Sequence, residues 1–326
     1  MKFGVYVFPD KSLNEILRLC QMAEKAGVEY CWVADEAPSP PFRDPFATFA
    51  ALGNGTERLK LGSGINVPYV RHPALLAYAM KSFDELFPGR MMLGLGPGGS
   101  LSMKPLGLKM WDRPLIALKE AVQICRRLFN GETVTFEGEL FKLYNTKLYD
   151  KPSSPIPIFL AARGPQMLQL AGEVADGSIS NIPPKIVPSI VEQISEGAKR
   201  SGRPLDSFTL TSTMPISIAK SRDEARKSAR SKLVNTIAYA HPETHRLTGI
   251  DLASVERLVK GVGGGWGASP NLVTDEMIDL YSFTGTLDEV VDQLKDYNKE
   301  GVDVFNFTLN TEQDIQMIRE VVPSFL

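Results

Sequence analysis

Short apolar runs alternate with longer amphipathic segments along this chain. The first run, residues 2–8, is rich in β-branched and aromatic residues, which is typical of a strand buried on both faces. The next segment begins with Ser12-Leu13-Asn14-Glu15, a capping box that predicts a helix, and Gly27 ends it. The same reading predicts strands at 2–8, 30–34, 59–63, 91–95, 158–161, 177–180, 209–218 and 304–309. Helices are predicted at 12–27, 44–53, 73–86, 114–129, 164–175, 186–201, 222–240, 286–301 and from Thr311 onward.

Strands that alternate with helices in this way form parallel sheets with crossover helices. Eight such units predict an α/β protein with a (β/α)8 TIM barrel, formed by residues 1–326 as a single domain. Two segments depart from the rhythm. Residues 133–143 predict a hairpin that turns near Gly138, and about 219–285 predict an insertion after the seventh strand. This insertion is a candidate lid over the loop side of the barrel, or else a surface excursion or a dimer contact.

Composition narrows the possible partners. The 326 residues are 43% hydrophobic and 23% charged, with a formal net charge of -2, so no nucleic-acid partner is expected. Three scattered cysteines argue against a disulfide framework. Because Met1 leads directly into a strand and no apolar run could span a bilayer, we predict a cytoplasmic protein without a membrane partner.

The exit of the third strand is the first candidate site. Residues 59–63 form the strand, and Gly64, Ile65 and Asn66 follow where a parallel strand gives way to its loop. Glycine at such a point permits unusual backbone angles or a close approach to a ligand. Pro73 then starts the next helix. In a barrel, this exit lies at the face where such folds keep their chemistry.

Two further strand exits have features of binding loops. Gly94-x-Gly96-x-x-Gly99 matches a dinucleotide fingerprint, but no helix begins inside it, so we expect a loop that a flat or phosphorylated ligand approaches, or a plain turn. The candidate residues there are Gly96, Pro97 and Gly98. The second exit places a cation between a strand end and a helix N-terminus, which favours a phosphate, although a surface arginine beside an ordinary helix start fits as well. Its candidates are Ala161, Ala162, Arg163 and Gly164.

Asp35 and Glu36 place two adjacent carboxylates at the end of the second strand. Such a pair can perform acid–base work, or it can simply be solvated. His241 and His245 stand four apart, but Pro242 lies between them and no third ligand is evident, so we expect a loop and no metal site.

Taken together, these segments resemble the bacterial-luciferase-like superfamily, and within it the branch that uses the deazaflavin coenzyme F420, typified by methylenetetrahydromethanopterin reductase. The resemblance covers most of the chain. It is carried by Met1-Lys2-Phe3-Gly4, Trp32-Val33-Ala34-Asp35, the run from Leu61 to Pro73, Leu93-Gly94-Leu95-Gly96-Pro97-Gly98, Gly164-Pro165-Gln166-Met167-Leu168, Ala171-Gly172-Glu173 and Phe283-Thr284-Gly285-Thr286.

The resemblance implies an oxidoreductase that transfers a hydride between F420 and a carbon atom of a small-molecule substrate. It also implies a homodimer or higher homo-oligomer, with the coenzyme at the C-terminal mouth of the barrel. A non-proline cis peptide at Gly64-Ile65 would lie behind the central ring. Residues 96–98 and 161–165 would hold the ring edge and the phosphate tail.

The chain departs from the reductase pattern at three positions that would face substrate. Tyr6 and Gly99 replace acidic residues, and Glu36 replaces a histidine. Asp35 and Glu36 are therefore the predicted catalytic residues, Asp35 orienting the ring and Glu36 facing substrate, and their mutual repulsion should raise the pKa of one of them. An FMN-dependent monooxygenase and a non-catalytic flavin- or deazaflavin-binding protein are the alternatives.

Overall fold

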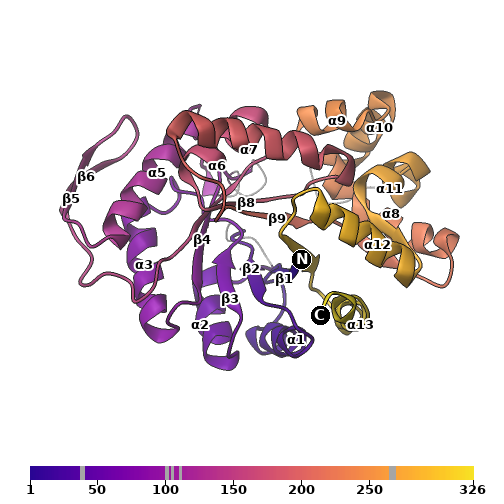
Figure 1. Cartoon of the computed structure of the whole chain (residues 1–326), viewed down its shortest axis with the longest axis horizontal. Coiled ribbons are helices and arrows are strands. Elements are labelled where there is room, and N and C mark those ends of the chain that lie inside the picture. The colour runs from indigo at the N-terminus through magenta and orange to yellow at the C-terminus, as the bar shows by residue number, and fades with distance from the viewer. Residues whose placement is uncertain (37–40, 100–102, 104–105, 110–111, 264–268) are drawn as a thin grey trace.

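The computed structural model describes residues 1–36, 41–99, 103, 106–109, 112–263 and 269–326. Within these residues eight parallel strands close into a barrel, in the order β1-β12-β9-β8-β7-β4-β3-β2 (Figure 1). The strands are β1 (Lys2–Val7), β2 (Tyr30–Val33), β3 (Lys60–Ser63), β4 (Met91–Leu95), β7 (Ile158–Ala161), β8 (Gly177–Ser180), β9 (Thr209–Thr213) and β12 (Val304–Thr308). The predicted (β/α)8 barrel is confirmed, and every predicted strand except the seventh matches to within one residue.

Helices surround the barrel, and their starts follow from local capping. The side chains of Ser12, Asp44 and Thr286 each accept a hydrogen bond from a backbone N–H of the first helical turn. These N–H groups have no acceptor inside the helix, so each side chain stabilises its helix start. The helices that follow barrel strands are α1 (Leu13–Lys25), α2 (Pro45–Gly55), α3 (Pro73–Leu86), α5 (Pro114–Phe129), α6 (Pro165–Val174), α7 (Val187–Ser201), α12 (Leu287–Lys299) and α13 (Glu312–Val321). The predicted hairpin also forms, as β5 (Val134–Glu137) and β6 (Lys142–Thr146).

The predicted seventh strand, 209–218, is wrong as one element. The chain leaves the barrel after β9, and Ile216–Ile218 (β10) pairs instead with Phe283–Gly285 (β11) in a separate two-stranded parallel sheet. Pro215 lies at the break. Proline lacks the N–H that a ladder requires, so a continuous strand is disfavoured there.

The segment between β10 and β11 is largely helical, with α8 (Arg222–Ala238), α9 (Pro242–Thr248), α10 (Leu252–Val262) and α11 (Asp275–Tyr281), while its residues 264–268 lie outside the described part. These helices gather at one end of the molecule, beside α12 (Figure 1). The predicted loop around His241 and His245 is wrong: His241 caps α9 by accepting the backbone N–H of Glu243, and His245 lies within the helix. The buried Nδ1 of His245 lies 2.8 Å from the hydroxyl of Tyr281.

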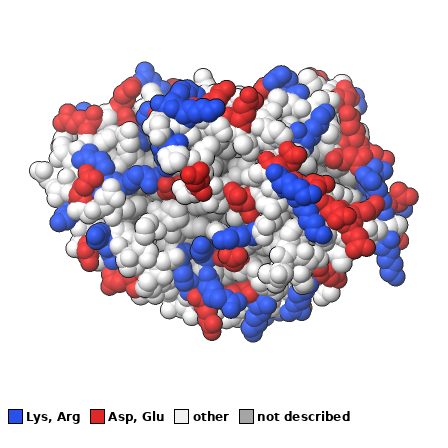
Figure 2. Space-filling model, viewed as in Figure 1, with Lys and Arg blue, Asp and Glu red and all other residues white. Residues whose placement is uncertain are grey.

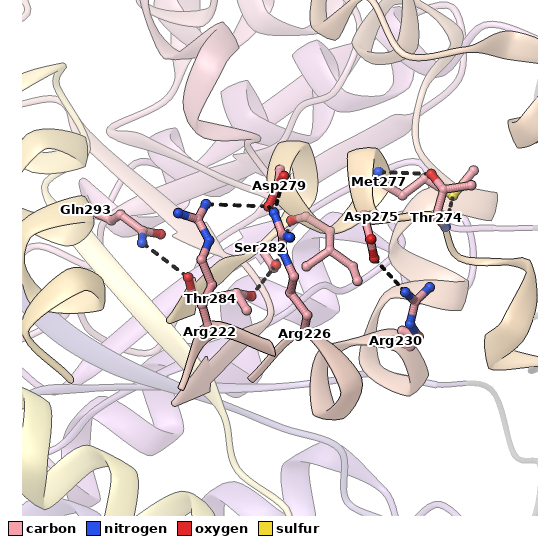
Figure 3. Close-up of polar contacts among 11 residues, drawn as sticks. Arg222, Arg226, Arg230, Thr274, Asp275, Met277, Asp279, Ser282, Thr284 and Gln293 are labelled. Atoms are coloured by element: carbon pink, nitrogen blue, oxygen red, sulfur yellow. Dashed lines mark hydrogen bonds and ion pairs between the residues drawn. The ribbon is translucent and has the colours of Figure 1, made fainter. Parts of the chain in front are cut away.

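A ladder of ion pairs joins α8 to the start and middle of α11 (Figure 3). Arg226 Nη2 donates to both carboxylate oxygens of Asp279, at 2.7 and 2.6 Å. Arg230 Nη2 donates to Asp275 Oδ1 at 2.5 Å. The arginines and the aspartates are each spaced by one helical turn, so successive pairs lie one above the other. These ion pairs connect α11 to α8.

Charge is not segregated on the molecule. Basic and acidic side chains intermingle over most of the face seen in Figure 2, as a net charge of -2 suggests. None of the described helices is long and apolar enough to cross a bilayer.

Candidate active site

The floor of the candidate site is built where β3 and β4 end. The peptide bond between Gly64 and Ile65 is cis, as the resemblance implied. The next residue, Asn66, continues the pairing beyond both strands: its N–H donates to Gly94 O at 2.8 Å, and its carbonyl accepts the N–H of Gly96 at 3.1 Å. Two of the predicted binding loops are therefore hydrogen-bonded to each other.

Two glycines of this floor have no room for a side chain. A Cβ on Gly96 would lie 2.8 Å from the Ile65 side chain, and Gly98 has a φ of +73° with Val67 only 2.9 Å from its Cβ position. Ile65 and Ala161 are partly buried and pack on the apolar interior of the barrel. The floor therefore combines apolar packing with glycines that cannot carry side chains, which fits the face of a planar ring.

Asp35 lies at the edge of this floor. Its Oδ2 accepts a hydrogen bond of 2.5 Å from Asn66 Nδ2. Burial raises the pKa of Asp35 from 3.8 to about 6, although the hydrogen bond from Asn66 and the charge of Arg71 lower it. The direction predicted for one member of the carboxylate pair is confirmed, and repulsion by Glu36 acts in that direction, but burial is the larger cause.

Tyr6 closes the floor from the β1 side. Its hydroxyl donates a hydrogen bond to the carbonyl oxygen of Gly64, and its ring packs 5.2 Å from that of Phe8. Burial raises the pKa of Tyr6 far above its ordinary value of 10.0, with the charges of Glu36 and Asp35 acting in the same direction. A hydroxyl that is already donating and holds its proton this tightly is a poor proton source at neutral pH.

The exit of β7 faces the insertion. Arg163 is exposed and donates from Nη1 to the carbonyl of Tyr239 at 3.1 Å. A Cβ on Gly164 would lie 2.8 Å from Nε2 of His241. Helix α6 begins at Pro165 and has no side-chain cap, so its first-turn N–H groups remain available to an anion.

These contacts sort the predicted site residues. Asp35, 64–66 and 96–98 form one connected surface. Ala161 borders that surface at Gly96, and Ala162 accepts a hydrogen bond from the hydroxyl of Ser180 in β8. Arg163 and Gly164 instead lie against the insertion. The sequence reading missed Tyr239 and His241 as neighbours of this exit, because no local pattern reports a contact made 76 residues away. In the described residues no group of three His, Cys, Asp or Glu side chains is placed to hold a metal ion.

Comparison with known proteins places this geometry in a family. The family Luciferase-like monooxygenase matches residues 1–304. The chain belongs to this family. It is 35% identical to 5,10-methylenetetrahydromethanopterin reductase of Archaeoglobus fulgidus over 308 residues, which cover 93% of this chain and 91% of that protein.

Two more relatives confirm the predicted resemblance to the F420-dependent branch. The structure of the coenzyme F420 dependent tetrahydromethanopterin reductase from Methanopyrus kandleri superimposes with a TM-score of 0.89 at 29% identity, covering 100% of this chain and 99% of that one. F420-dependent glucose-6-phosphate dehydrogenase of Nakamurella multipartita is 32% identical over 67% of each chain. Members of this branch thus differ in substrate.

Proposed function

We propose that this protein is an F420-dependent oxidoreductase that transfers a hydride between the coenzyme and a carbon atom of a small substrate, in the manner of methylenetetrahydromethanopterin reductase. The observation that carries the proposal is the flat apolar floor formed by Gly64, Ile65 and Gly96 at the mouth of the barrel. It occurs in a chain that aligns with an F420-dependent reductase over its whole length. The apolar side chains under the floor and its two crowded glycines suit the face of a deazaflavin ring.

The residues present fit the coenzyme at both of its ends. The ring would lie on Gly64, Ile65 and Asn66, with its edge along 96–98. Arg163 and the uncapped start of α6 would bind the phosphate, through a charged donor and backbone N–H groups. When bound, the coenzyme supplies the carbon that gives or accepts the hydride.

The chain itself contributes orientation and a proton. Asp35 is held by Asn66 beside the ring position and orients the ring or its surroundings. Glu36 follows it and faces substrate. A carbonyl acceptor gains a hydride at carbon and a proton at oxygen, and this carboxyl pair supplies the proton. An iminium carbon gains only the hydride, and the two carboxylates then stabilise its positive charge.

Titration with F420 and with FMN, followed by turnover, tests the proposal. We expect F420 to bind and its reduced form to be oxidised by a carbon acceptor under anaerobic conditions. The first probes are methylenetetrahydromethanopterin, tested with the reduced coenzyme, and glucose 6-phosphate, tested with the oxidised coenzyme. The family also contains monooxygenases, so the second candidate is an FMN enzyme that consumes oxygen. Tight FMN binding with oxygen uptake and no response to F420 would establish that candidate instead.

We also propose that the protein is a homo-oligomer that assembles through α3 and that it works in the cytoplasm. Leu75, Tyr78 and Leu86 of α3 are all exposed, and Tyr149 extends the patch, with its ring 6.2 Å from that of Tyr78. An apolar patch of this kind marks an association surface. Sedimentation of the protein and of a Leu75→Glu, Leu86→Glu variant measures the mass directly, and a wild-type monomer at micromolar concentration would refute the assembly.

A further inference from the structure

The loop that joins β3 to α3 first holds Asp35 and then turns back on itself. Asn66 begins it, donating from Nδ2 to Asp35 Oδ2 at 2.5 Å. The next residues form one tight turn, in which the N–H groups of Val70 and Arg71 both donate to Val67 O, at 3.0 and 3.1 Å. Because the turn is this short, Arg71 stays close to Asn66 and to the carboxyl that Asn66 holds.

The guanidinium of Arg71 is fixed on two sides. Its Cζ lies 3.9 Å from the centroid of the Phe46 ring, and its Nη2 lies 3.6 Å from Asp44 Oδ2. Asp44 is fixed in turn as the N-cap of α2, since its Oδ1 accepts the N–H groups of Phe46 and Ala47 at 2.8 and 3.1 Å. Stacking on an aromatic face and pairing with a carboxylate both hold a guanidinium in place. The positive charge therefore has a defined position beside the site.

We propose that Arg71 is a positioning residue for the reaction, held by Phe46 and Asp44 so that its positive charge keeps Asp35 ionised near neutral pH. This inference rests on the proposed function, in which Asp35 orients the ring and supports proton transfer. A group that takes part in proton transfer works best when its pKa lies near the working pH. Arg71 acts through Asp35 and has no contact with the coenzyme or the substrate in this role.

The titratable groups around Asp35 give the proposal two opposite signs. Burial raises the pKa of Asp35, and the hydrogen bond at Oδ2 and the charge of Arg71 lower it. The charges of Asp44 and Glu36 raise it again. On the β1 side Tyr6 keeps its proton, because burial raises its pKa far above 10.0. Loss of the Arg71 charge should therefore raise the pKa of Asp35, and loss of the Asp44 charge should lower it.

The first test measures the ionisation of Asp35 in the full-length protein without coenzyme. Aspartate carboxyl carbons are isotopically labelled and titrated by NMR, and the Asp35 signal is the one missing from Asp35→Asn. We expect Arg71→Gln to raise the midpoint and Asp44→Asn, which keeps the helix cap, to lower it. Each shift should be about 0.2–0.7 pH unit, the size of a partly exposed charge interaction. Arg71→Lys should stay near the wild type, and about 1 M salt should shrink the Arg71→Gln shift.

The insertion provides a matched control. On α10 the exposed Arg257 likewise lies beside an N-cap aspartate, with its Nη2 3.9 Å from Asp251 Oδ2. Arg257→Gln and Asp251→Asn remove the same charges from the same kind of pair, and we expect the Asp35 midpoint to stay unchanged in both.

The second test is the pH profile of kcat/KM with F420 for the same variants. Whichever protonation state of Asp35 the reaction uses, the limb of the profile that belongs to Asp35 follows its pKa. That limb should therefore move to higher pH in Arg71→Gln and to lower pH in Asp44→Asn, by the amounts found in the NMR titration.

Three results would overturn the proposal. The first is an unchanged Asp35 midpoint in Arg71→Gln. The second is a pair of shifts of the same sign in Arg71→Gln and Asp44→Asn, which would indicate a rearranged loop. The third is a moved midpoint with an unmoved kcat/KM profile, which would remove Arg71 from the reaction. Misfolding cannot produce opposite shifts that Arg71→Lys avoids. Failure of the proposed function looks different, because the wild type then shows no turnover with F420 while the NMR titration still reports whether Arg71 acts on Asp35.

Discussion

Replacing Asp35 by Asn should stabilise the folded protein at neutral pH. The pKa of Asp35 is about 6 in the fold and 3.8 ordinarily, so the folded state binds the proton more tightly than the unfolded chain does. The ionised carboxylate therefore opposes folding. The cost is absent below about pH 4, where both states are protonated, grows as the pH rises to 6, and is full above that. At 1.36 kcal/mol per pKa unit, the full cost is about 3 kcal/mol.

Asparagine removes this charge while keeping an oxygen that can accept the hydrogen bond from Asn66. An unfolding entropy of about 2.1 cal/mol/K per residue over 326 residues converts 3 kcal/mol into a rise in melting temperature of about 4 °C. Melting curves at about pH 8 and about pH 4 measure it, with the rise expected only at the higher pH. Asp292→Asn, at an exposed carboxylate, is the matched control. An equal shift at both pH values, or a lower melting temperature at pH 8, would refute the reasoning.

The same variant should lose activity. If Asp35 orients the ring and supports proton transfer, Asp35→Asn lowers turnover by about 10²–10⁴-fold and changes coenzyme affinity much less. A more stable and less active variant is the signature of a group retained for function at the expense of stability. A variant that is more stable and fully active would leave Asp35 without a catalytic role.

Four further predictions follow from the site and the insertion. Glu36→Gln should reduce turnover by about 10²–10⁴-fold with a near-normal coenzyme dissociation constant, as steady-state kinetics and titration will show. Arg163→Ala should weaken F420 binding by on the order of 1–3 kcal/mol, the value of a charged hydrogen bond, and an unchanged dissociation constant would remove Arg163 from the phosphate site. Gly96→Ala should weaken F420 binding about ten-fold by raising the floor beside Ile65, whereas Gly99→Ala, whose Cβ meets nothing within 4 Å, should not. Burial lowers the pKa of His245 below 6.5, so its contribution to stability is complete above pH 6.5 and is lost as the pH falls from there through the lower folded pKa; His245→Gln should flatten this acid limb of the melting curve.

Local pattern was sufficient to predict most of the barrel, because its strands are short runs of apolar, β-branched and small residues, several of them bounded by glycine or proline. The bounds of β4, β7, β8, α3 and α5 follow directly from such punctuation. The seventh strand is the exception. Residues 209–218 are mostly β-branched or apolar, which favours one strand, and only Pro215 signals that the chain leaves the barrel there. The partner it leaves for, β11, lies far along the chain, so the pairing could not be read from this run.

The candidate site likewise has features that the sequence could predict and features that it could not. Because the exits of parallel strands meet at one end of a barrel, the sequence could predict that Asp35, Asn66 and Gly96 all lie at that end. It could not predict the burial that raises the pKa of Asp35, since that depends on the packing of several loops at once. Nor could it predict that Tyr239 contacts Arg163, which depends on how the insertion folds back. Strand order therefore determines which residues reach the mouth, whereas long-range packing determines their chemistry, and it is the packing that the Asp35→Asn variant tests.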